Sequence, residues 1–281
     1  MQLNPRYEGA PVLCLELPLE DPRAALMRQR RRLLSTLRAL DAERWGEASR
    51  CAGWSVQDVA AHLGSTDRFW ALSVRSGLAG SPTRFLATFD PVATPEQLVG
   101  PSRDQSPAAV LDELTASVDD LDDALAGVGP DGWSTLAEAP PGHVALEAVV
   151  LHALWDGWVH ERDVVVPLGL PVTEEPDEVT ACLAYVAALG PVFLATAGSQ
   201  RTGRLEVAAN SPPTRFVVEA GPTVTVRLPV EADAGAPRLT GPAVDLIEAL
   251  SFRAPLRHDL GAGDRWLLGG LAEVFDQPAV Q

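Results

Sequence analysis

The residues of this chain best suited to chemistry are metal-binding side chains spaced four apart. His152, Asp156 and His160 lie in a stretch, 143–163, whose apolar residues recur at helical spacing. Residues four apart share one helical face, so two of them can hold one ion. His152 and His160 are separated by about 12 Å at ~1.5 Å of rise per residue, so they cannot both bind it directly. We therefore expect Asp156 to pair with one histidine or the other.

A third ligand is available on another predicted helix, which Ser55 can cap and Asp58 can support as in a capping box. The inward-facing stripe of this helix includes His62. Two histidines and one carboxylate form a common three-ligand set for a divalent metal, and such a set leaves positions open for water or a thiolate. The alternative interpretation is that each histidine is a hydrogen-bonded residue at the edge of the core. The placement on inward stripes of two bundle helices favours the metal.

Helical patterns dominate the first two thirds of the chain. They predict an irregular extension over 1–20 and then an up-and-down helical bundle over 21–198. The predicted helices start near residues 21, 55, 106, 143 and 177, at positions with capping residues or proline. The segment 77–105 is rich in Gly, Pro, Ser and Thr and lacks periodicity, so we expect a long loop that acts as a lid or binding segment.

The pattern changes after Gly203. Short runs rich in β-forming residues, separated by Pro and Gly, predict strands over 205–209, 215–219 and 223–228. Helical patterns return over 241–251 and 264–275. Strands followed by helices indicate a small α+β domain over 199–281 that packs against the bundle, so the predicted fold class is α+β.

Composition narrows the class of partner. The formal charge of −16 argues against nucleic acid and anionic membranes, which attract positive charge, and so favours a small-molecule substrate. All 22 basic residues are arginine, which excludes lysine Schiff-base chemistry. Three scattered cysteines predict no disulfide framework. We see no signal peptide and no apolar run long enough to cross a bilayer, and we expect a cytoplasmic protein.

Three segments resemble one known family. The stretch 54–63, which reads WSVQDVAAHL, is similar to the second-helix signature of the mycothiol-dependent maleylpyruvate isomerase family, within the DinB-like metal-binding helical bundles. The stretch 156–163, DGWVHERD, resembles the second metal motif of that family. The stretch 239–246, LTGPAVDL, is similar to a helix opening in its C-terminal domain, which resembles a sterol-carrier fold. The resemblance spans about 22 to 276.

This resemblance implies a metal site, a thiol cofactor and a reaction class. His62, Asp156 and His160 would bind Zn²⁺, and the open position would receive the sulfur of mycothiol, a low-molecular-weight thiol. The implied activity is cis–trans isomerisation or S-transfer on a small electrophile that bears carboxylates, such as maleylpyruvate. The family usually has Glu where this chain has Asp156. His152 and Asp163 are therefore candidates for orienting partners or alternative ligands.

Arginines are the candidate groups for gripping anionic parts of the substrate and the cofactor, because a guanidinium binds carboxylates in a bidentate way. Arg253 follows the family-like helix of the C-terminal domain and is the candidate catalytic arginine. Arg84 and Arg103, in the long loop, are candidate cofactor-binding residues. Four tryptophans could line the pocket or simply belong to the core: Trp54, Trp70, Trp155 and Trp158.

Two other functions are compatible with the sequence. The first is a non-catalytic protein in which the bundle and the second domain hold an apolar small molecule or a lipid. The second is a bundle enzyme recruited to a specialised biosynthetic pathway, with or without the metal. Fold and ligand set alone do not identify a substrate.

Overall fold

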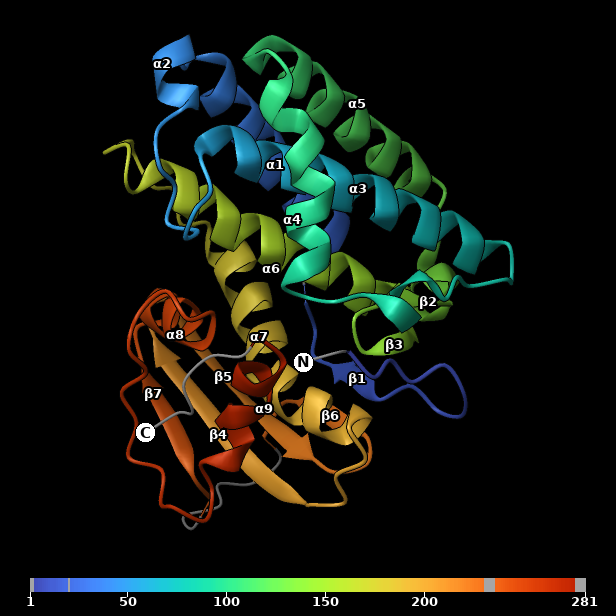
Figure 1. Cartoon of the computed structure of the whole chain (residues 1–281). Helices are drawn as coiled ribbons and strands as arrows, with labels where there is room; N and C mark the ends of the chain where they lie inside the picture. The colour runs from blue at the N-terminus through green and yellow to red at the C-terminus, as the bar shows by residue number, and fades with distance from the viewer. Residues whose placement is uncertain (1–2, 20, 230–235, 276–281) are drawn as a thin grey trace.

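The computed structural model describes residues 3–19, 21–229 and 236–275. A helical N-terminal domain lies above a mixed β-sheet, as Figure 1 shows. The α+β class that the sequence predicts is confirmed.

Four long helices build the N-terminal domain and pack against one another: α1 (Pro22–Arg38), α3 (Val56–Leu78), α5 (Pro107–Ala126) and α6 (Leu146–Val165). A short helix, α2 (Ala42–Trp45), connects α1 to the loop before α3. Asp21 caps α1 by accepting hydrogen bonds from two backbone amides. The predicted capping box of α3 is present, because Ser55 and Asp58 each bond the other's backbone amide. These caps fix where each helix begins and therefore which side chains face inward.

The segment 77–105 is not the continuous loop that the sequence predicts. The helix α3 continues to Leu78, and the segment then forms η1 (Phe85–Thr88), α4 (Ala93–Val99) and η2 (Gly100–Asp104). Asp90 accepts bonds from the backbone amides of Val92 and Ala93 and so starts α4. Helices of one or two turns are too short to give a periodic pattern, which is why the sequence indicated only a loop.

A small hairpin connects α5 to α6. After η3 (Pro130–Ser134), the strands β2 (Leu136–Ala139) and β3 (Gly142–Ala145) pair in antiparallel fashion, where the sequence predicted only turns and the start of a helix. The following helix therefore begins at Leu146 and ends at Val165, slightly later than the predicted 143–163.

The helix α7 (Pro176–Thr196) runs between the two domains and belongs to the core. The sequence predicted no apolar run long enough to cross a membrane, and α7 shows that this expectation was wrong. An 18-residue window of this helix has a mean hydropathy of 1.9, which is apolar enough for a membrane span. However, 83% of that window is buried inside the protein. The helix contacts α6 on one side and the sheet on the other, so its hydrophobicity is explained by core packing.

The C-terminal domain is a five-stranded mixed sheet covered by helices. Its strands are β4 (Gly203–Asn210), β5 (Pro213–Ala220), β6 (Val224–Arg227) and β7 (Arg238–Gly241), with β1 (Leu13–Glu16) at one edge in the order β1-β6-β5-β4-β7. The helices α8 (Ala243–Leu250) and α9 (Trp266–Val274) pack against α7 and against β4. The three predicted strands and both predicted helices are present, and β7 is an addition that the sequence did not indicate.

The N-terminal extension is not wholly irregular. Leu13–Glu16 forms β1 and pairs in parallel with β6, more than 200 residues later in the chain. Leu13 is fully buried in the core. A four-residue edge strand that depends on a distant partner leaves almost no local signal, which explains why the prediction was wrong for these residues.

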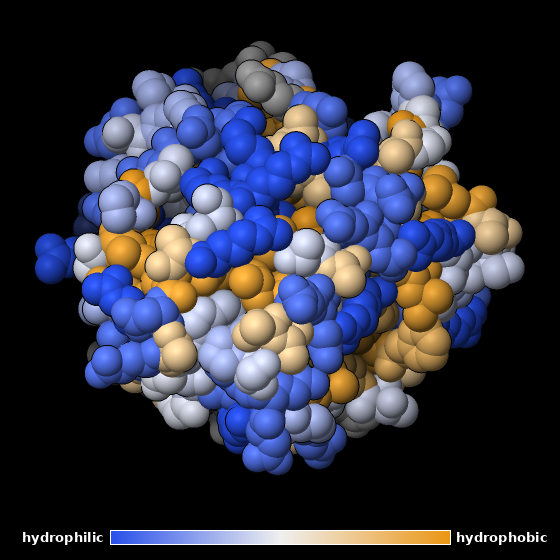
Figure 2. All heavy atoms as spheres, turned by 90° about the horizontal axis from the view of Figure 1, so that it is seen from above, coloured by the Kyte–Doolittle hydropathy of each residue, from blue (hydrophilic) through white to orange (hydrophobic). Residues whose placement is uncertain are grey.

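The outer face of the helical domain is mostly hydrophilic. Figure 2 shows this face from above, with charged and polar side chains over most of the surface and hydrophobic ones in smaller separate groups. Many of the arginines on this side form ion pairs with acidic residues of neighbouring helices, such as Arg75 with Asp120. The arginine run of α1 behaves similarly, because Arg32 pairs with Glu161 and Glu178.

Candidate functional site

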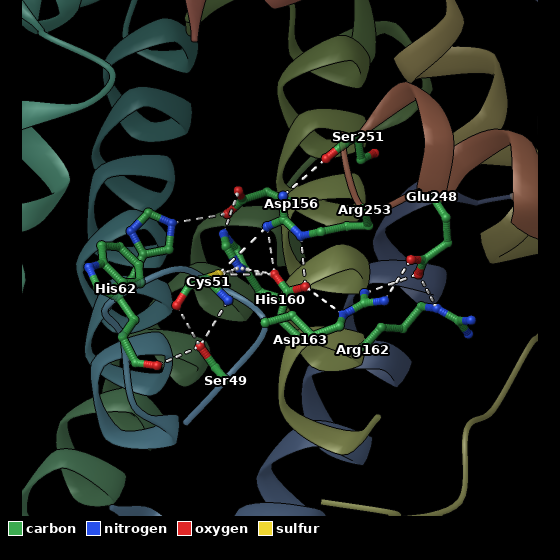
Figure 3. A network of polar contacts seen from close by, with 12 residues as sticks. Ser49, Cys51, His62, Asp156, His160, Arg162, Asp163, Glu248, Ser251 and Arg253 are labelled. Atoms are coloured by element: carbon green, nitrogen blue, oxygen red, sulfur yellow. Dashed lines mark hydrogen bonds and ion pairs between the residues drawn. The ribbon is translucent and has the colours of Figure 1, made fainter. Parts of the chain in front are cut away.

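Three candidate metal ligands converge from two helices. His62 projects from α3, and Asp156 and His160 project from α6, as Figure 3 shows. Nε2 of His62 lies 3.8 Å from Oδ2 of Asp156, and Nε2 of His160 lies 3.5 Å from Oδ1. Donor atoms bound at ~2.1 Å around a tetrahedral ion are separated by about 3.4 Å. One donor atom from each of the three side chains lies within 4.8 Å of the others, so the group is close enough to surround one divalent cation, despite the short side chain of Asp156.

The carboxylate of Asp156 is an unsatisfied buried anion. Oδ2 is buried without a hydrogen-bond partner among the described residues. Burial by itself would raise the pKa of Asp156, but the nearby imidazoles of His160 and His62 outweigh burial and hold this pKa well below its usual range. The carboxylate is thus ionised, and its Oδ2 has no donor within hydrogen-bond distance among the described residues. A bound cation would satisfy it.

Asp163 orients His160 for metal binding. Nδ1 of His160 and Oδ2 of Asp163 are 3.0 Å apart, so Nδ1–H donates to the carboxylate and Nε2 faces Asp156. Burial lowers the pKa of His160, yet Asp156 and Asp163 outweigh burial and raise it to about 10. Two carboxylates around one imidazole make this position attractive to positive charge. Asp163 thus has the contact that is expected of an orienting partner.

Asp163 is itself held by two arginines. Arg253 donates from Nε and Nη2 to its two oxygens at 2.8 and 2.6 Å, and Arg50 donates to Oδ1 at 3.0 Å. Burial would raise the pKa of Asp163, but the bonds from Arg253 and the neighbouring His160 keep this pKa well below its usual range. Arg253 lines the cavity, as expected for the candidate catalytic arginine, although its charge is engaged by Asp163.

A second acidic residue connects this cluster to the C-terminal domain. Glu248, on α8, accepts bonds from Arg50 at 2.6 and 3.1 Å and from Arg162 of α6 at 2.6 Å. Figure 3 shows Glu248 and Arg162 beside Asp163 and Arg253. The orientation of His160 thus depends on residues from both domains.

Cys51 is a site residue that the sequence analysis missed. It precedes α3 and lines the cavity, and its thiol donates to Oδ2 of Asp163 at 3.1 Å and lies 3.5 Å from Nδ1 of His160. Together with His160 and Asp163 it forms a second group with metal-ligand geometry. The available signal was its position directly before the helix that carries His62. Cys14 and Cys182 are free thiols elsewhere.

The contacts of His152 connect it to aromatic residues and not directly to Asp156. It lines the cavity, but its Nδ1 bonds the hydroxyl of Tyr185 at 2.8 Å and its ring packs against Trp70 and Trp155. No hydrogen bond joins it to Asp156 among the described contacts, so it does not orient that carboxylate through one. Burial lowers the pKa of His152 to about 4, so its imidazole is neutral.

The two loop arginines lie outside the cavity lining. Arg84 pairs with Glu8 and lies over the ring of Tyr7. Arg103 donates to Asp58 at 2.9 Å and to Glu96 at 2.7 Å. In this conformation neither guanidinium reaches the cluster of His62, Asp156 and His160. The sequence of the segment 77–105 alone could not reveal that both arginines form ion pairs with acidic residues outside the cavity, because these pairs form only in the folded protein.

A cavity of about 530 Å³ opens beside the three candidate ligands. It lies where α3, α6 and α7 meet the segment after α8 and the end of α9, a junction between domains that commonly forms a ligand site. Three of the four candidate tryptophans line it: Trp54, Trp70 and Trp155. Trp158 is instead fully buried, with the guanidinium of Arg162 over its ring.

Comparisons with known proteins agree with this architecture. A family model described as the mycothiol maleylpyruvate isomerase N-terminal domain matches residues 26–165, which carry all three candidate ligands. Two similar solved structures are the mycothiol-dependent maleylpyruvate isomerase and a histidine-to-alanine mutant of it. Each is 18% identical, with a TM-score of 0.60 over 85% of this chain and 90% of that chain, which establishes a shared fold. No curated protein matches the sequence.

Proposed function

Because the helical domain of this chain belongs to the mycothiol maleylpyruvate isomerase N-terminal domain family, we propose that the protein is a metal-dependent, thiol-using enzyme. Its cofactors are Zn²⁺ and mycothiol, and its substrate is a small electrophile. The observation that carries this proposal is the convergence of His62, Asp156 and His160 beside an open cavity. We propose that it acts in the cytoplasm.

The donor set supports zinc, because two imidazoles and one carboxylate suit this ion and leave a coordination position open. When bound, the metal would lower the pKa of a thiol ligand and keep a thiolate available at neutral pH. The protein residues hold this arrangement in place. Asp163 fixes the tautomer of His160, and Arg253 and Arg50 fix Asp163.

The reaction class follows from the nucleophilic sulfur that a thiol would supply beside this cavity if His62, Asp156 and His160 held it through a metal. Such a sulfur would be able to add reversibly to a conjugated carbon–carbon double bond, so the site would support either cis–trans isomerisation or formation of a thioether.

Metal content tests the proposal directly. We expect the purified protein to contain about one zinc ion per chain by elemental analysis, and the His62→Ala variant to lose both the metal and mycothiol-dependent turnover. His143→Ala is a matched control, because His143 lies in the β2–β3 hairpin and bonds the backbone of Thr83 outside the cavity. This control should keep metal and turnover. A metal-free wild-type protein with undiminished turnover would exclude the proposed function.

A specific observation also supports a second candidate function. The cavity lining is largely apolar, so the same chain could act as a non-catalytic carrier of an apolar ligand. Native mass spectrometry separates the two functions: a carrier retains an apolar ligand and contains no metal, whereas the proposed enzyme contains zinc.

A further inference from the structure

The walls of the cavity next to the candidate metal ligands are made mainly of hydrophobic side chains. Phe69 and Trp70 line it from α3, Trp155 from α6 and Phe193 from α7, and Trp54 lines it from the loop just before α3. Several of the hydroxyl groups in the lining are already used, because Ser65 and Thr66 donate to carbonyls of their own helix. The lining thus offers large apolar contact area and few polar groups to a ligand.

The lining also lacks a free positive charge among the described residues. Arg253 is the one arginine in it, and its guanidinium donates two bonds to Asp163 and one to the carbonyl of Ser251. A divalent cation there is offset by Asp156 and by a thiolate ligand. A dicarboxylate would therefore enter this cavity without a free cation to pair with its two negative charges, at a large desolvation cost.

One neutral hydrogen-bond donor does point to a ligand. Tyr185 is fully buried, and its hydroxyl lies 2.8 Å from Nδ1 of His152, its one hydrogen-bond partner among the described residues. If Nδ1 carried the proton, the buried phenol O–H would have no acceptor, so Tyr185 donates and His152 holds its proton on Nε2. No bond from Nε2 to a described residue is present, and His152 lines the cavity. Its N–H is therefore available to a carbonyl oxygen.

The mouth of the cavity carries exposed apolar side chains. Phe85, Val92 and Leu98, from the η1–α4 segment, are 59%, 58% and 53% exposed, and all three line the cavity. Exposed hydrophobic residues gathered around an opening are typical of a binding site for an apolar ligand. They extend the apolar walls outward to solvent.

We propose that this cavity binds an uncharged, predominantly hydrophobic carbonyl compound with an aromatic substituent, and that Nε2–H of His152 donates to its carbonyl oxygen. This inference rests on the proposed function for its reaction, since such a compound with a conjugated double bond is the electrophile. The substrate class that we propose is therefore an uncharged carbonyl compound and not a small dicarboxylate such as maleylpyruvate.

Binding of unreactive probes tests the inference separately from the enzyme activity. Benzylacetone is a saturated ketone that carries a phenyl group and has no conjugated double bond to which a thiol can add, and succinate is a small saturated dicarboxylate. Titration calorimetry should show that benzylacetone binds both the wild-type protein and the His62→Ala variant, and that succinate binds neither. Tighter binding of succinate than of benzylacetone would overturn the inference, even if zinc and turnover are found.

Two substitutions locate the bound probe. Leu98→Ser should weaken benzylacetone binding several-fold, whereas Leu72→Ser should not, because Leu72 is 44% exposed on α3 and does not line the cavity. His152→Leu should weaken benzylacetone about three- to tenfold, as expected for one neutral hydrogen bond, and should leave butylbenzene nearly unchanged. Equal losses for both probes would contradict the hydrogen bond to His152. Equal losses of benzylacetone affinity in Leu98→Ser and Leu72→Ser would contradict binding in this cavity.

Discussion

His152 is a neutral histidine kept in the interior by its surroundings. Its ring lies between Trp70, Trp155 and Tyr185, and burial is the main reason why its pKa falls from 6.5 to about 4. A nearby carboxylate, Asp156, works in the opposite direction but does not cancel burial. This position can thus offer a donor without adding charge to an apolar cavity.

The shift predicts an acid-sensitive step in stability. Between pH 6.5 and pH 4 the unfolded chain protonates His152, whereas the folded protein does not, so folding stability falls as the pH decreases through this window. A shift of this size corresponds to about 3 kcal/mol. We expect His152→Leu to flatten the decrease when the free energy of unfolding is measured in urea at several pH values, with chelator present.

Tyr185→Phe separates burial from the hydrogen bond in this experiment. The variant keeps the histidine buried but removes the phenol, so it should lose about 1 kcal/mol of stability and keep most of the pH dependence. An unchanged pH profile in His152→Leu would show that the imidazole titrates normally in the folded protein, against the burial argument.

The candidate ligands could be predicted from sequence because one helical repeat places them. Four-residue spacing put Asp156 and His160 on one face, and the capped start of α3 aimed His62 inward. The partners of Asp163 could not be predicted in this way. Arg50 and Cys51 come from a loop whose backbone is attached to α6, since the amide of Arg50 donates to the carbonyl of Asp163 at 3.0 Å. Such contacts depend on tertiary packing.

Elements with their own local signals were predicted well, and elements that depend on distant partners were not. The long helices have capping residues and apolar stripes within their own sequence. By contrast, β1 and β7 are four-residue strands at the two edges of the sheet, each paired in parallel with a strand remote in sequence. Tertiary contacts decide whether such short segments become strands.

The edge strand β1 should contribute measurably to stability, although it lies in the N-terminal segment. Leu13 is buried to 1% exposure, and truncation of a buried leucine commonly costs about 2–4 kcal/mol. We expect Leu13→Ala to lower the free energy of unfolding by an amount in this range. Glu16→Ala, in the same strand but with an exposed side chain, should change it by less than about 0.5 kcal/mol. Similar small effects in both variants would mean that β1 does not hold the sheet edge in solution.

At the scale of the whole molecule, the site depends on both domains. The helical domain supplies the three candidate ligands, whereas the segment after α8 supplies Arg253, which holds Asp163 and thereby His160. The walls of the cavity likewise come from both domains, with Phe193 of α7 and Leu271 of α9 facing the helices α3 and α6. The residues that form these walls could not be predicted from the sequence of either domain alone, because the cavity forms only where the two domains pack together.

Glu248 provides the sharpest test of this coupling. Its carboxylate joins α8 to Arg50 and Arg162 of the helical domain, and all three side chains are largely buried. Glu248→Ala would leave Arg50 and Arg162 without this partner, so we expect the free energy of unfolding in urea to fall by about 2–3 kcal/mol. We also expect weaker zinc binding, because the neighbours of Asp163 would no longer be held in place. Glu113→Ala, which removes an exposed ion pair with Arg68 inside the helical domain, should cost less than about 0.5 kcal/mol and leave zinc affinity unchanged. Equal effects of the two substitutions would indicate that the domains contribute to stability and to the site independently.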